Sequence, residues 1–489
     1  MDVVNKIWGY CHTLRHEGVD YADYVEQISC LLFLKMADER GRDELATLTV
    51  TDASGETRTV DATWPTLYAQ SGIALVDHYQ DVLRALAKQD GILGDIFADA
   101  QNRVTAPASL KQLLTLINEV NWLEMPMDVK AAVFEGLLEK AASEGKKGAG
   151  QYFTPRLLIQ AIIQCMQPDP RQAADFTLGD PACGTGGFLI EAYDWFKDET
   201  GGGAMDVALA KRVKERTYFG QELVQRPRRL ALMNMYLHGL AGNVTLGDSI
   251  YHAYTGPSFD VVLANPPFGT RGAGNAPDRD DFTIETSNKQ LNFLQHILTT
   301  LKPGGRAAVV VPDNCLFADQ AGDVFEKLTE QADLHTVLRL PRGTFTPYSP
   351  GTKTYVVFFR KGVPTETTWL YDARTGVPSI TKRDRPLTAA HFAEFVACYG
   401  DDPNGKAERS KGDSADDRWR PFTIQQVKDA GYKIDSFKWL HDDEHDDLSD
   451  LPEPEELATD ALDELAAATE ELNQILSLLE PVGPSEVAA

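Results

Sequence analysis

Long hydrophobic runs and paired cysteines are both lacking in this 489-residue sequence. No apolar stretch approaches the roughly 18–20 residues that cross a membrane. The chain does not open with a basic region followed by an apolar core, as a secretory signal does. The six cysteines are scattered without a C-x-x-C pair, which disfavours a structural zinc site and favours free thiols in a reducing compartment. We therefore expect a cytoplasmic protein of two or three domains, with no metal and no membrane association.

Positive charge is also scarce. The formal net charge is −26, and residues 441–489 contain 16 acidic residues but neither Lys nor Arg. A protein that grips DNA by itself usually carries a basic surface. If the substrate is a nucleic acid, we expect a partner to supply much of the contact with the phosphate backbone. No Walker-type sequence is present either, so no triphosphate site is predicted.

Hydrophobic periodicity divides the chain into three predicted domains. Residues 1–145 carry apolar positions at a helical period, clearest over Tyr21–Met36, and predict an all-helical domain with a loop or small hairpin over Val50–Thr63. Strand and helix candidates alternate within residues 146–440, which is typical of a mainly parallel α/β sheet covered on both faces. Further helices are expected at Asp77–Ala87, Ser109–Val120, Val129–Ala142, Gly187–Asp198, Pro227–His238 and Asn292–Leu301. The expected strands are Phe176–Gly179, Thr217–Gly220, Asn243–Leu246, Phe259–Ala264, Arg306–Val311, Thr336–Leu340 and Thr354–Arg360.

The segment between the last two expected strands is too short and too rich in Gly and Pro for a helical crossover, so we expect an antiparallel pair at the sheet edge. Residues 441–489 begin with an acidic run and continue with a helix over about 454–480. The apolar positions of that helix are spaced 3-4-3-4, a heptad seam. The seam either docks on its own domain or joins a partner's coiled coil. The terminal position behind an acidic hinge favours the partner.

Asn265-Pro266-Pro267-Phe268 follows a buried strand directly. Two consecutive prolines lack N–H groups and hold φ fixed, so they stiffen the turn. The turn presents an amide, outward carbonyls and an aromatic ring at the carboxyl end of a strand, where ligands bind in open α/β sheets. The Asn265 side chain and the Pro266 carbonyl can accept the two N–H groups of a planar amine. Phe268 can stack on the base that carries this amine, although a core position is the alternative.

Three earlier strand ends also carry acids. Asp180 opens a Gly-rich turn that contains Ala182, Gly184, Thr185, Gly186 and Gly187. An acid there, without the Lys-Ser/Thr of a triphosphate loop, suits a ligand with a cationic amino-acid portion. Glu222 can accept both hydroxyls of a ribose, and Asp248 can accept from the exocyclic amine of an adenine ring. Any one of these acids could be a helix cap, but four marked strand ends in succession are hard to explain as caps.

The motifs DPACGTGGFL, GQE, GDS and NPPF, in this order, resemble those of S-adenosylmethionine-dependent amino-methyltransferases. GAGQYFTPR at residues 148–156 resembles the motif before the Gly-rich loop in the gamma-ordered adenine-N6 class. LLFLKMAD at 31–38, NMYLHG at 234–239, LKPGGR at 301–306, and LPRGTF at 340–345 with residues 354–359 resemble the modification (M) subunit of type I restriction-modification systems. The resemblance covers roughly residues 1–360.

This resemblance implies a Rossmann-like, seven-stranded methyltransferase sheet that binds S-adenosyl-L-methionine. It places Tyr152, Phe153 and Thr154 at the methionine end of the cofactor, beside Gln151. It implies a site-specific adenine-N6 methyltransferase of double-stranded DNA in bacteria or archaea. The implied partners are a sequence-specificity (S) subunit, with two M subunits per S, and a restriction (R) subunit for cleavage. Cytosine N4, a protein glutamine amide, or a non-catalytic scaffold that positions the S subunit are the alternatives, and Asn at 265 favours adenine.

Two further residue-level expectations concern the neighbourhood of the catalytic turn. Cys183 invites the role of a nucleophile, but amine methylation needs no thiolate and the motif places no base beside it, so we expect a small packed residue. The polar segment Gly269–Gln290 contains three glycines, Arg271, Arg279 and Lys289. Because it follows NPPF directly, we expect a mobile loop that orders around DNA.

Overall fold

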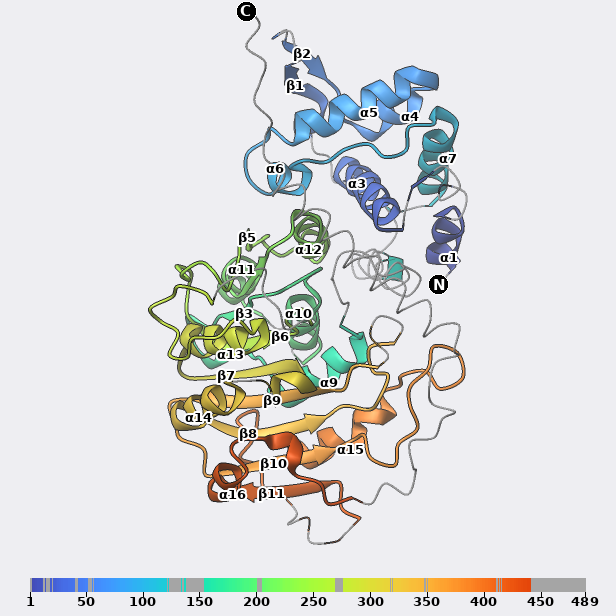
Figure 1. Ribbon diagram of the computed structural model, residues 1–489. Coiled ribbons are helices and arrows are strands. Elements are labelled where there is room, and N and C mark those ends of the chain that lie inside the picture. The colour runs from blue at the N-terminus through green and yellow to red at the C-terminus, as the bar shows by residue number, and fades with distance from the viewer. Residues whose placement is uncertain are drawn as a thin grey trace, which may run out of the picture. The chain divides into compact units, whose positions relative to one another are not determined.

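The computed structural model describes most of residues 2–120, then 154–199, 205–268 and most of 276–440, with a few isolated positions between 122 and 137. Residues 1–440 form one compact unit. The expected α/β class is confirmed: a helical N-terminal region precedes a central sheet (Figure 1). The domain limits at 145 and 440 stay predictions. The expected helix at 454–480 lies outside the described residues, and so does the expected helix at Val129–Ala142 apart from residues 133, 136 and 137.

The N-terminal region is built around helix α3 (Tyr21–Glu39), as the apolar period of that segment predicts. Every residue from Tyr24 to Leu34 is buried, so the helix is enclosed on all sides rather than on one face. The small hairpin that was one of the two expectations for Val50–Thr63 is present, because β1 and β2 pair antiparallel. The elements are α1 (Asp2–Gly9), α3, η1 (Asp43–Thr47), β1 (Leu48–Thr51), β2 (Thr57–Val60), α4 (Trp64–Ala69), α5 (Gly72–Leu86), α6 (Ile92–Phe97) and α7 (Pro107–Asn118).

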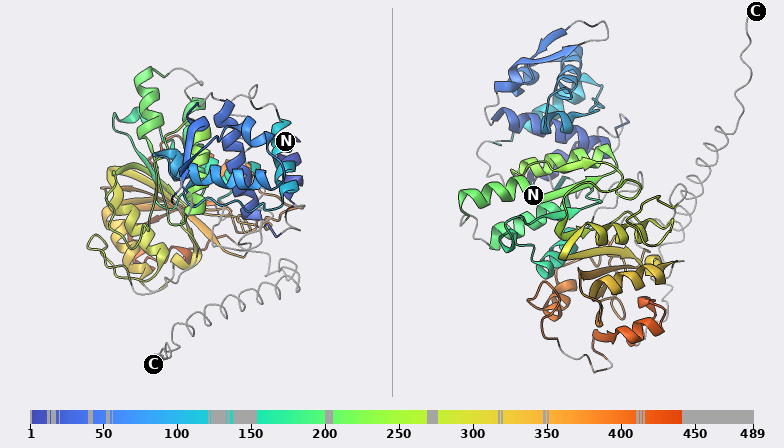
Figure 2. Two further views of the ribbon diagram at one scale, coloured as in Figure 1. Left: turned by 90° about the horizontal axis from the view of Figure 1, so that it is seen from above. Right: turned by 90° about the vertical axis from the view of Figure 1, so that its left-hand side faces the viewer.

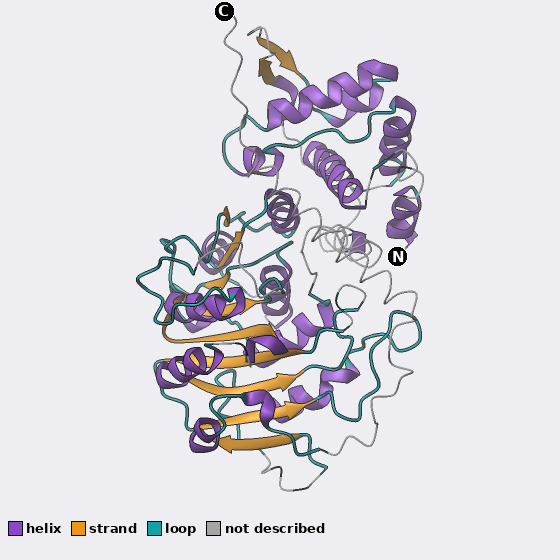
Figure 3. Cartoon of the chain, viewed as in Figure 1, coloured by secondary structure: helices purple, strands orange, loops and turns teal. Residues whose placement is uncertain are grey.

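The described residues of the central region form a nine-stranded sheet in the order β11-β10-β8-β9-β7-β6-β3-β4-β5. The strands are drawn in orange in Figure 3. Strands β7, β6, β3, β4 and β5 are parallel to their neighbours in that run. The strands are β3 (Leu178–Asp180), β4 (Tyr218–Glu222), β5 (Val244–Leu246), β6 (Phe259–Ala264), β7 (Leu301–Pro312), β8 (Ala332–Arg339), β9 (Thr354–Lys361), β10 (Thr367–Asp372) and β11 (Trp419–Thr423).

Helices cover both faces of this sheet (Figure 2). In β6, Val261 and Leu263 belong to one hydrophobic cluster, whereas Val262 and Ala264 belong to the other. This alternation is what a strand buried on both faces requires, because successive side chains point to opposite faces. The helices are α9 (Arg156–Met166), α10 (Gly187–Glu199), α11 (Val207–Arg216), α12 (Gln225–Leu237), α13 (Lys289–Thr300), α14 (Ala321–Gln331), α15 (Ala390–Tyr399) and α16 (Ile424–Asp429), with short 3-10 turns at Pro170–Gln172, Asp313–Leu316 and Ile434–Ser436.

The last two expected strands, β8 and β9, do pair antiparallel. Their expected place at the sheet edge is wrong, because β9 lies between β7 and β8, and β8 pairs further with β10. The two strands beyond the expected seven come from residues 361–440, where sequence patterning predicts no regular element. Packing of large aromatic rings holds them: Trp369 of β10 stacks on Trp419 of β11 with ring centroids 5.3 Å apart.

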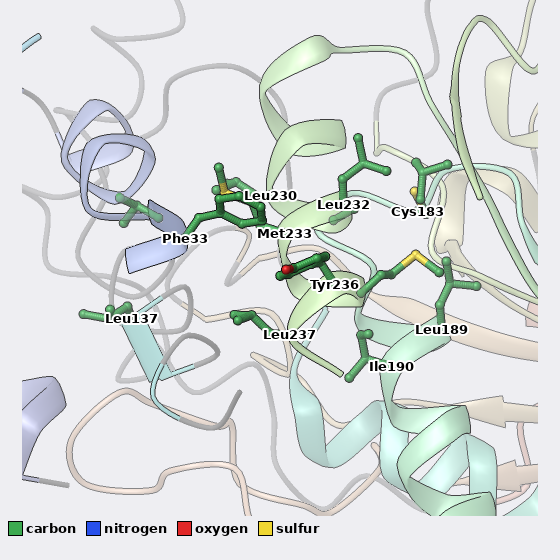
Figure 4. Packing of buried hydrophobic residues seen from close by; sticks show 14 of the residues in the cluster. Phe33, Leu137, Cys183, Leu189, Ile190, Leu230, Leu232, Met233, Tyr236 and Leu237 are labelled. Atoms are coloured by element: carbon green, nitrogen blue, oxygen red, sulfur yellow. The ribbon is translucent and has the colours of Figure 1, made fainter. Parts of the chain in front are cut away.

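The N-terminal region packs on α12, the helix that follows β4. Phe33 of α3 lies 4.8 Å from Tyr236 of α12, ring centroid to centroid (Figure 4). Beside these rings, the buried Arg229 pairs with the buried Glu26, and Arg229 Nε donates to the Ile96 carbonyl at 2.7 Å. Removing one partner of a buried ion pair typically costs about 3–5 kcal/mol. This contact therefore couples α3 to the sheet near the end of β4.

Candidate active site

The carboxyl ends of β6, β3, β4 and β5 meet at one edge of the sheet, because these four strands are parallel neighbours. Asp180 ends β3, Glu222 ends β4, Asp248 follows β5 by two residues, and Asn265 follows β6 directly. The four polar strand ends that the sequence singles out therefore lie along one edge, in an order set by the topology.

The Gly-rich turn after β3 depends on glycine at two places. Gly184 and Gly186 have φ values of 53° and 84°, a region that other residues rarely adopt. A Cβ on Gly184 would meet no atom within 4 Å, so open space lies in front of the backbone there. A Cβ on Gly186 would approach Ala231 of α12 at 3.5 Å. One glycine thus leaves room for a ligand, and the other sits where the turn packs on a helix.

Two buried carboxylates stand beside this turn. Asp180 is 3% exposed and accepts from the Ala182 N–H at 3.0 Å. Glu222 accepts from the Gly184 N–H at 3.0 Å and from the Val224 N–H at 2.9 Å, one bond to each oxygen. Burial raises the pKa of Asp180 to about 8, and the neighbouring Glu222 charge adds to the rise. Burial also raises the pKa of Glu222. A cationic ligand beside them favours the ionised form of both groups, and each carboxylate oxygen can accept more than one bond, so both groups keep capacity for such a ligand.

Asp248 takes part in a turn after β5. Its Oδ1 accepts from the backbone N–H groups of Ile250 at 2.7 Å and Tyr251 at 2.9 Å. The carboxylate therefore caps the following turn. Capping was the alternative to ligand binding in the interpretation of the acids at the strand ends. The neighbouring Ser249 hydroxyl donates to the Pro181 carbonyl at 2.6 Å, so the loops after β5 and β3 are tied together.

Asn265 is oriented by a side chain from before α9. Its Nδ2 donates to the Thr154 hydroxyl oxygen at 2.9 Å. Its Oδ1 is buried, and no residue that the structure describes donates to it. A buried acceptor without a donor is costly unless a ligand supplies one. The amide thus presents an acceptor oxygen at the carboxyl end of β6.

The turn itself is held by Gln290, a residue that the sequence analysis does not single out. The Gln290 side chain is fully buried and its Nε2 donates to the Pro267 carbonyl at 2.9 Å. Pro266 is buried and Pro267 is exposed. The available signal was the density of amide residues in the otherwise apolar helix QLNFLQHIL, because a buried Gln must find hydrogen-bond partners.

Phe268 completes the turn. Its ring is half-buried and meets the buried Phe345 ring edge-to-face, with centroids 5.1 Å apart. Phe345 lies in the segment after β8. The ring of Phe268 is thus supported at its edge by a second aromatic, an arrangement that fixes its plane.

Cys183 is buried in the same turn. Burial first, and the charges of Asp180 and Glu222 next, raise the pKa of its thiol well above the ordinary value. Its sulfur lies where a Cβ on Gly220 would approach to 2.8 Å. The thiol is therefore protonated and packed, in agreement with the expectation that it is not a nucleophile.

The segment after NPPF differs in part from the expectation. Residues 269–275, with Arg271, lie outside the described residues, but Arg279 is 7% exposed and bonded within the protein. Its Nη1 donates to the Ser249 carbonyl at 2.7 Å, and its Nη2 pairs with Asp281 at 2.6 Å. The expectation that this arginine belongs to a mobile loop is wrong, because its guanidinium is anchored to the loop after β5.

Gln151, Tyr152 and Phe153 lie outside the described residues. Ala182 and Gly187 are partly buried in the Gly-rich turn, and the Thr185 carbonyl accepts from Asn234 of α12 at 3.4 Å. Within the described part of the chain, no cluster of His, Cys, Asp and Glu could hold a metal. No described helix is long and apolar enough to cross a membrane.

Comparison with known proteins gives matches over the whole chain. Residues 126–447 match the N-6 DNA methylase family, and residues 3–120 match the HsdM N-terminal domain family. The methylase subunit of the type I restriction enzyme StySPI from Salmonella potsdam is 37% identical, over 97% of this chain and 94% of its own length. The methylase subunit of type I restriction enzyme EcoKI from Escherichia coli (strain K12) is 36% identical, over 100% and 96%.

Two solved structures of type I restriction-modification proteins are also similar to this chain. The crystal structure of the EcoKI M protein is 33% identical, with a TM-score of 0.55, and covers 100% of this chain and 98% of that chain. A chain from a study of complex assembly and conformational transition in the type I R-M system is 27% identical, with a TM-score of 0.73, and covers 98% and 99%.

Proposed function

The chain belongs to the N-6 DNA methylase family and, within it, to the methylase subunits of type I restriction enzymes, and on that premise we propose that it methylates the N6 amine of adenine in double-stranded DNA from S-adenosyl-L-methionine. The proposal depends mainly on the hydrogen bonding of the Asn265 side chain. Its Nδ2 is bonded to Thr154, and its buried Oδ1 has no donor among the described residues. An incoming N–H group satisfies that acceptor.

The exocyclic amine of adenine is a poor nucleophile because its lone pair is delocalised into the ring. The Asn265 Oδ1 and the Pro266 carbonyl each accept one of its N–H groups. The nitrogen then moves toward tetrahedral geometry, and its lone pair becomes available on one side. This is catalysis by positioning and by preorganised dipoles. Bound S-adenosyl-L-methionine supplies an electrophilic sulfonium methyl group. No covalent enzyme intermediate is needed.

The residues at the strand ends fit this methyl donor. Asp180 suits its cationic amino-acid portion, Glu222 its ribose hydroxyls and Asp248 its adenine amine. The open space in front of Gly184 lets the donor approach the backbone closely. Leu223 and Leu246 are 62% and 51% exposed beside Glu222 and Gly247, and they offer apolar contact to a flat ring. Gln151, Tyr152 and Phe153, with Thr154, would lie at the methionine end.

The target adenine must leave the duplex to reach Asn265. Unstacking and unpairing cost a few kcal/mol, and stacking on an aromatic ring returns about 1–3 kcal/mol per base. Phe268 is the ring at this place, with Phe345 behind its edge. Cytosine N4 or a glutamine amide presents the same planar NH2 group, and Asn rather than Ser at position 265 favours adenine.

Assembly with other subunits follows from family membership and from charge. We infer that a specificity subunit brings the DNA, with two methylase chains per specificity chain, and that a restriction subunit joins for cleavage. We also propose three domains: residues 1–145 form a helical domain, residues 146–440 form the methyltransferase domain, and residues 441–489 form an assembly segment. The shortage of basic residues supports a partner for DNA binding.

Methyl transfer from labelled donor to DNA, by the chain alone and with its specificity subunit, tests the proposal. We expect adenine labelling that requires the partner and falls at least about 100-fold in Asn265→Ala, the usual scale for one preorganised hydrogen-bonding group. Labelling of protein, or full transfer by Asn265→Ala, would refute it. Tight donor binding with no transfer to any substrate would favour the scaffold alternative.

A further inference from the structure

The loop after β10 lies at the same sheet edge as the catalytic turn. β10 is parallel to β8, β8 and β7 are both antiparallel to β9, and β7 is parallel to β6. β10 and β6 therefore run in the same direction, and their carboxyl ends face the same way. The residues that follow β10 belong to the edge where Asn265 and Phe268 stand.

A chain of contacts joins this loop to Phe268. The Phe268 ring touches Phe345, which belongs to the turn at residues 342–346. Ile380 binds that turn at both of its backbone groups: its N–H donates to the Arg342 carbonyl at 2.9 Å, and its carbonyl accepts from the Thr346 hydroxyl at 3.3 Å. A Cβ on Gly343 would lie 2.2 Å from the Ile380 carbonyl oxygen, so the close approach requires glycine there.

The next five residues form a closed, exposed loop. The Thr381 N–H donates to the Arg385 carbonyl at 2.9 Å, and the Arg385 N–H donates to the Thr381 hydroxyl at 3.0 Å. Between these bonds stand Lys382, Arg383 and Asp384, and all residues from 382 to 385 are exposed. The loop residues 381–385 include three cationic side chains and one acidic side chain, on a chain whose net charge is −26.

We propose that the loop 381–385 binds the phosphate backbone of the substrate DNA beside the extruded adenine, through Lys382, Arg383 and Arg385. This inference rests on the proposed function. This short basic loop is bonded to the turn that supports Phe268. It can therefore contact the backbone of the DNA strand whose adenine stacks on Phe268. Its backbone bonds give it a fixed shape before DNA arrives, which lowers the ordering cost of binding. The loop thus provides phosphate contacts from the methylase chain itself, in addition to those that the specificity subunit provides.

The test compares two charge-neutralised variants of the complex with the specificity subunit. K382Q/R383Q/R385Q removes the proposed contacts. The control K211Q/K214Q/R216Q removes the same charge from exposed positions on α11, whose end leads into the amino end of β4 at the opposite sheet edge. Affinity for a duplex oligonucleotide is measured by fluorescence anisotropy over a range of KCl concentrations, with donor binding and thermal unfolding in parallel.

The slope of log K against log salt is negative, and we expect it to be less negative by about 2–3 in the loop variant, since each phosphate contact contributes about −0.9. The control should keep the wild-type slope, and donor binding should be unchanged in both. Equal slopes in the loop variant and the wild type overturn the inference. So does loss of the specificity subunit from the loop variant in size-exclusion chromatography, because the loop would then be a protein contact. A slope change in a complex that transfers no methyl group supports the loop and refutes the proposed function.

Discussion

Thr154 and Asn265 are 111 residues apart in sequence and are joined by one hydrogen bond, from the Asn265 Nδ2 to the Thr154 hydroxyl oxygen at 2.9 Å. In this bond the nitrogen end of the amide faces Thr154. With Nδ2 directed toward Thr154, the buried Oδ1 has no donor among the described residues, and under the proposed function it accepts from the substrate amine. A hydroxyl in the segment before the Gly-rich turn thus sets the orientation of a group after the fourth strand of the sheet.

Thr154→Val should therefore lower the rate of methyl transfer. The valine keeps the shape of threonine but cannot accept from Nδ2, so the amide loses its fixed orientation. We expect kcat to fall about 10- to 100-fold, the scale of a misplaced reacting group, and Thr154→Ser to retain most of the activity. Single-turnover transfer to DNA measures this. A wild-type rate in Thr154→Val would show that other contacts orient the amide.

Gln290 should act on the rate through the Pro267 carbonyl. In Gln290→Leu this carbonyl loses its donor, and the turn that carries Phe268 is held less firmly. Gln295→Leu is the matched control, because Gln295 is buried in the same helix and, among the residues that the structure describes, its side chain bonds to loop residues 283 and 284 and to Asn292 rather than to the NPPF turn.

Both glutamine variants should lose about 1–3 kcal/mol of unfolding free energy, the cost of unsatisfied buried groups. Only Gln290→Leu should lower kcat, on the order of tenfold, with unchanged KM for the methyl donor. Denaturant unfolding and steady-state kinetics separate the two effects. An equal loss of kcat in both variants would mean that Gln290 has a structural role alone.

The pKa of Asp180 leads to a dependence of stability on pH. Burial raises this pKa to about 8 from an ordinary value of 3.8. Between those values the folded protein holds a proton that the unfolded chain has released, so the free energy of unfolding falls as pH rises. Asp180→Asn removes the titrating group, so its stability should decline less than that of the wild type between pH 5 and pH 8. Urea denaturation at several pH values checks this, and parallel curves for the two proteins would contradict it.

Arg279 should affect the binding of the methyl donor. Its guanidinium binds the Ser249 carbonyl directly after Asp248, and Nη1 also lies 3.1 Å from the His296 Nδ1. Burial, followed by the charge of Arg279, lowers the pKa of His296 to about 3, so the imidazole is neutral and accepts. Lysine cannot reach these partners and Asp281 together. Arg279→Lys should therefore loosen the loop and raise KM for the donor about tenfold, since bonds from charged donors contribute about 1.5–3 kcal/mol.

Arg306→Lys is the control for this change. Arg306 is 6% exposed and likewise donates to backbone carbonyls, those of Met166 and Gln167, but it lies away from the strand ends. The two variants should be destabilised to a similar extent, and only Arg279→Lys should change KM for the donor. A similar rise in KM in both would refute the assignment to the donor site.

Deletion of residues 451–489 should abolish assembly with the specificity subunit, because the heptad seam of that segment would be lost. Residues 1–440 are one compact unit, so donor binding should persist in the truncated chain. Co-purification and calorimetric titration with S-adenosyl-L-methionine measure the two properties. Unchanged assembly would show that the subunit contact lies elsewhere.

Short-range patterns in the sequence were enough to predict much of this protein. β6 begins and ends where its apolar run and the two prolines predict, because φ restriction and strand burial act over neighbouring residues. The acids at successive strand ends were also identified from the sequence, because each one closely follows a short apolar run that predicts a strand. Parallel strands place their carboxyl ends at one edge, so the sequence also predicted that Asp180, Glu222, Asp248 and Asn265 lie along that edge.

Tertiary structure alone decided the contacts across long sequence separations. β8 and β9 became interior strands because residues 361–440 add two strands through a cluster of aromatic rings. Arg279, an apparent surface cation, is buried because the loop after β5 offers carbonyl groups to its guanidinium. Thr154 accepts a bond from Asn265, and Gln290 donates one to the Pro267 carbonyl, although both partners are distant in sequence. A side-chain hydrogen bond depends on where the backbone places its partner, and neither composition nor periodicity reports that position.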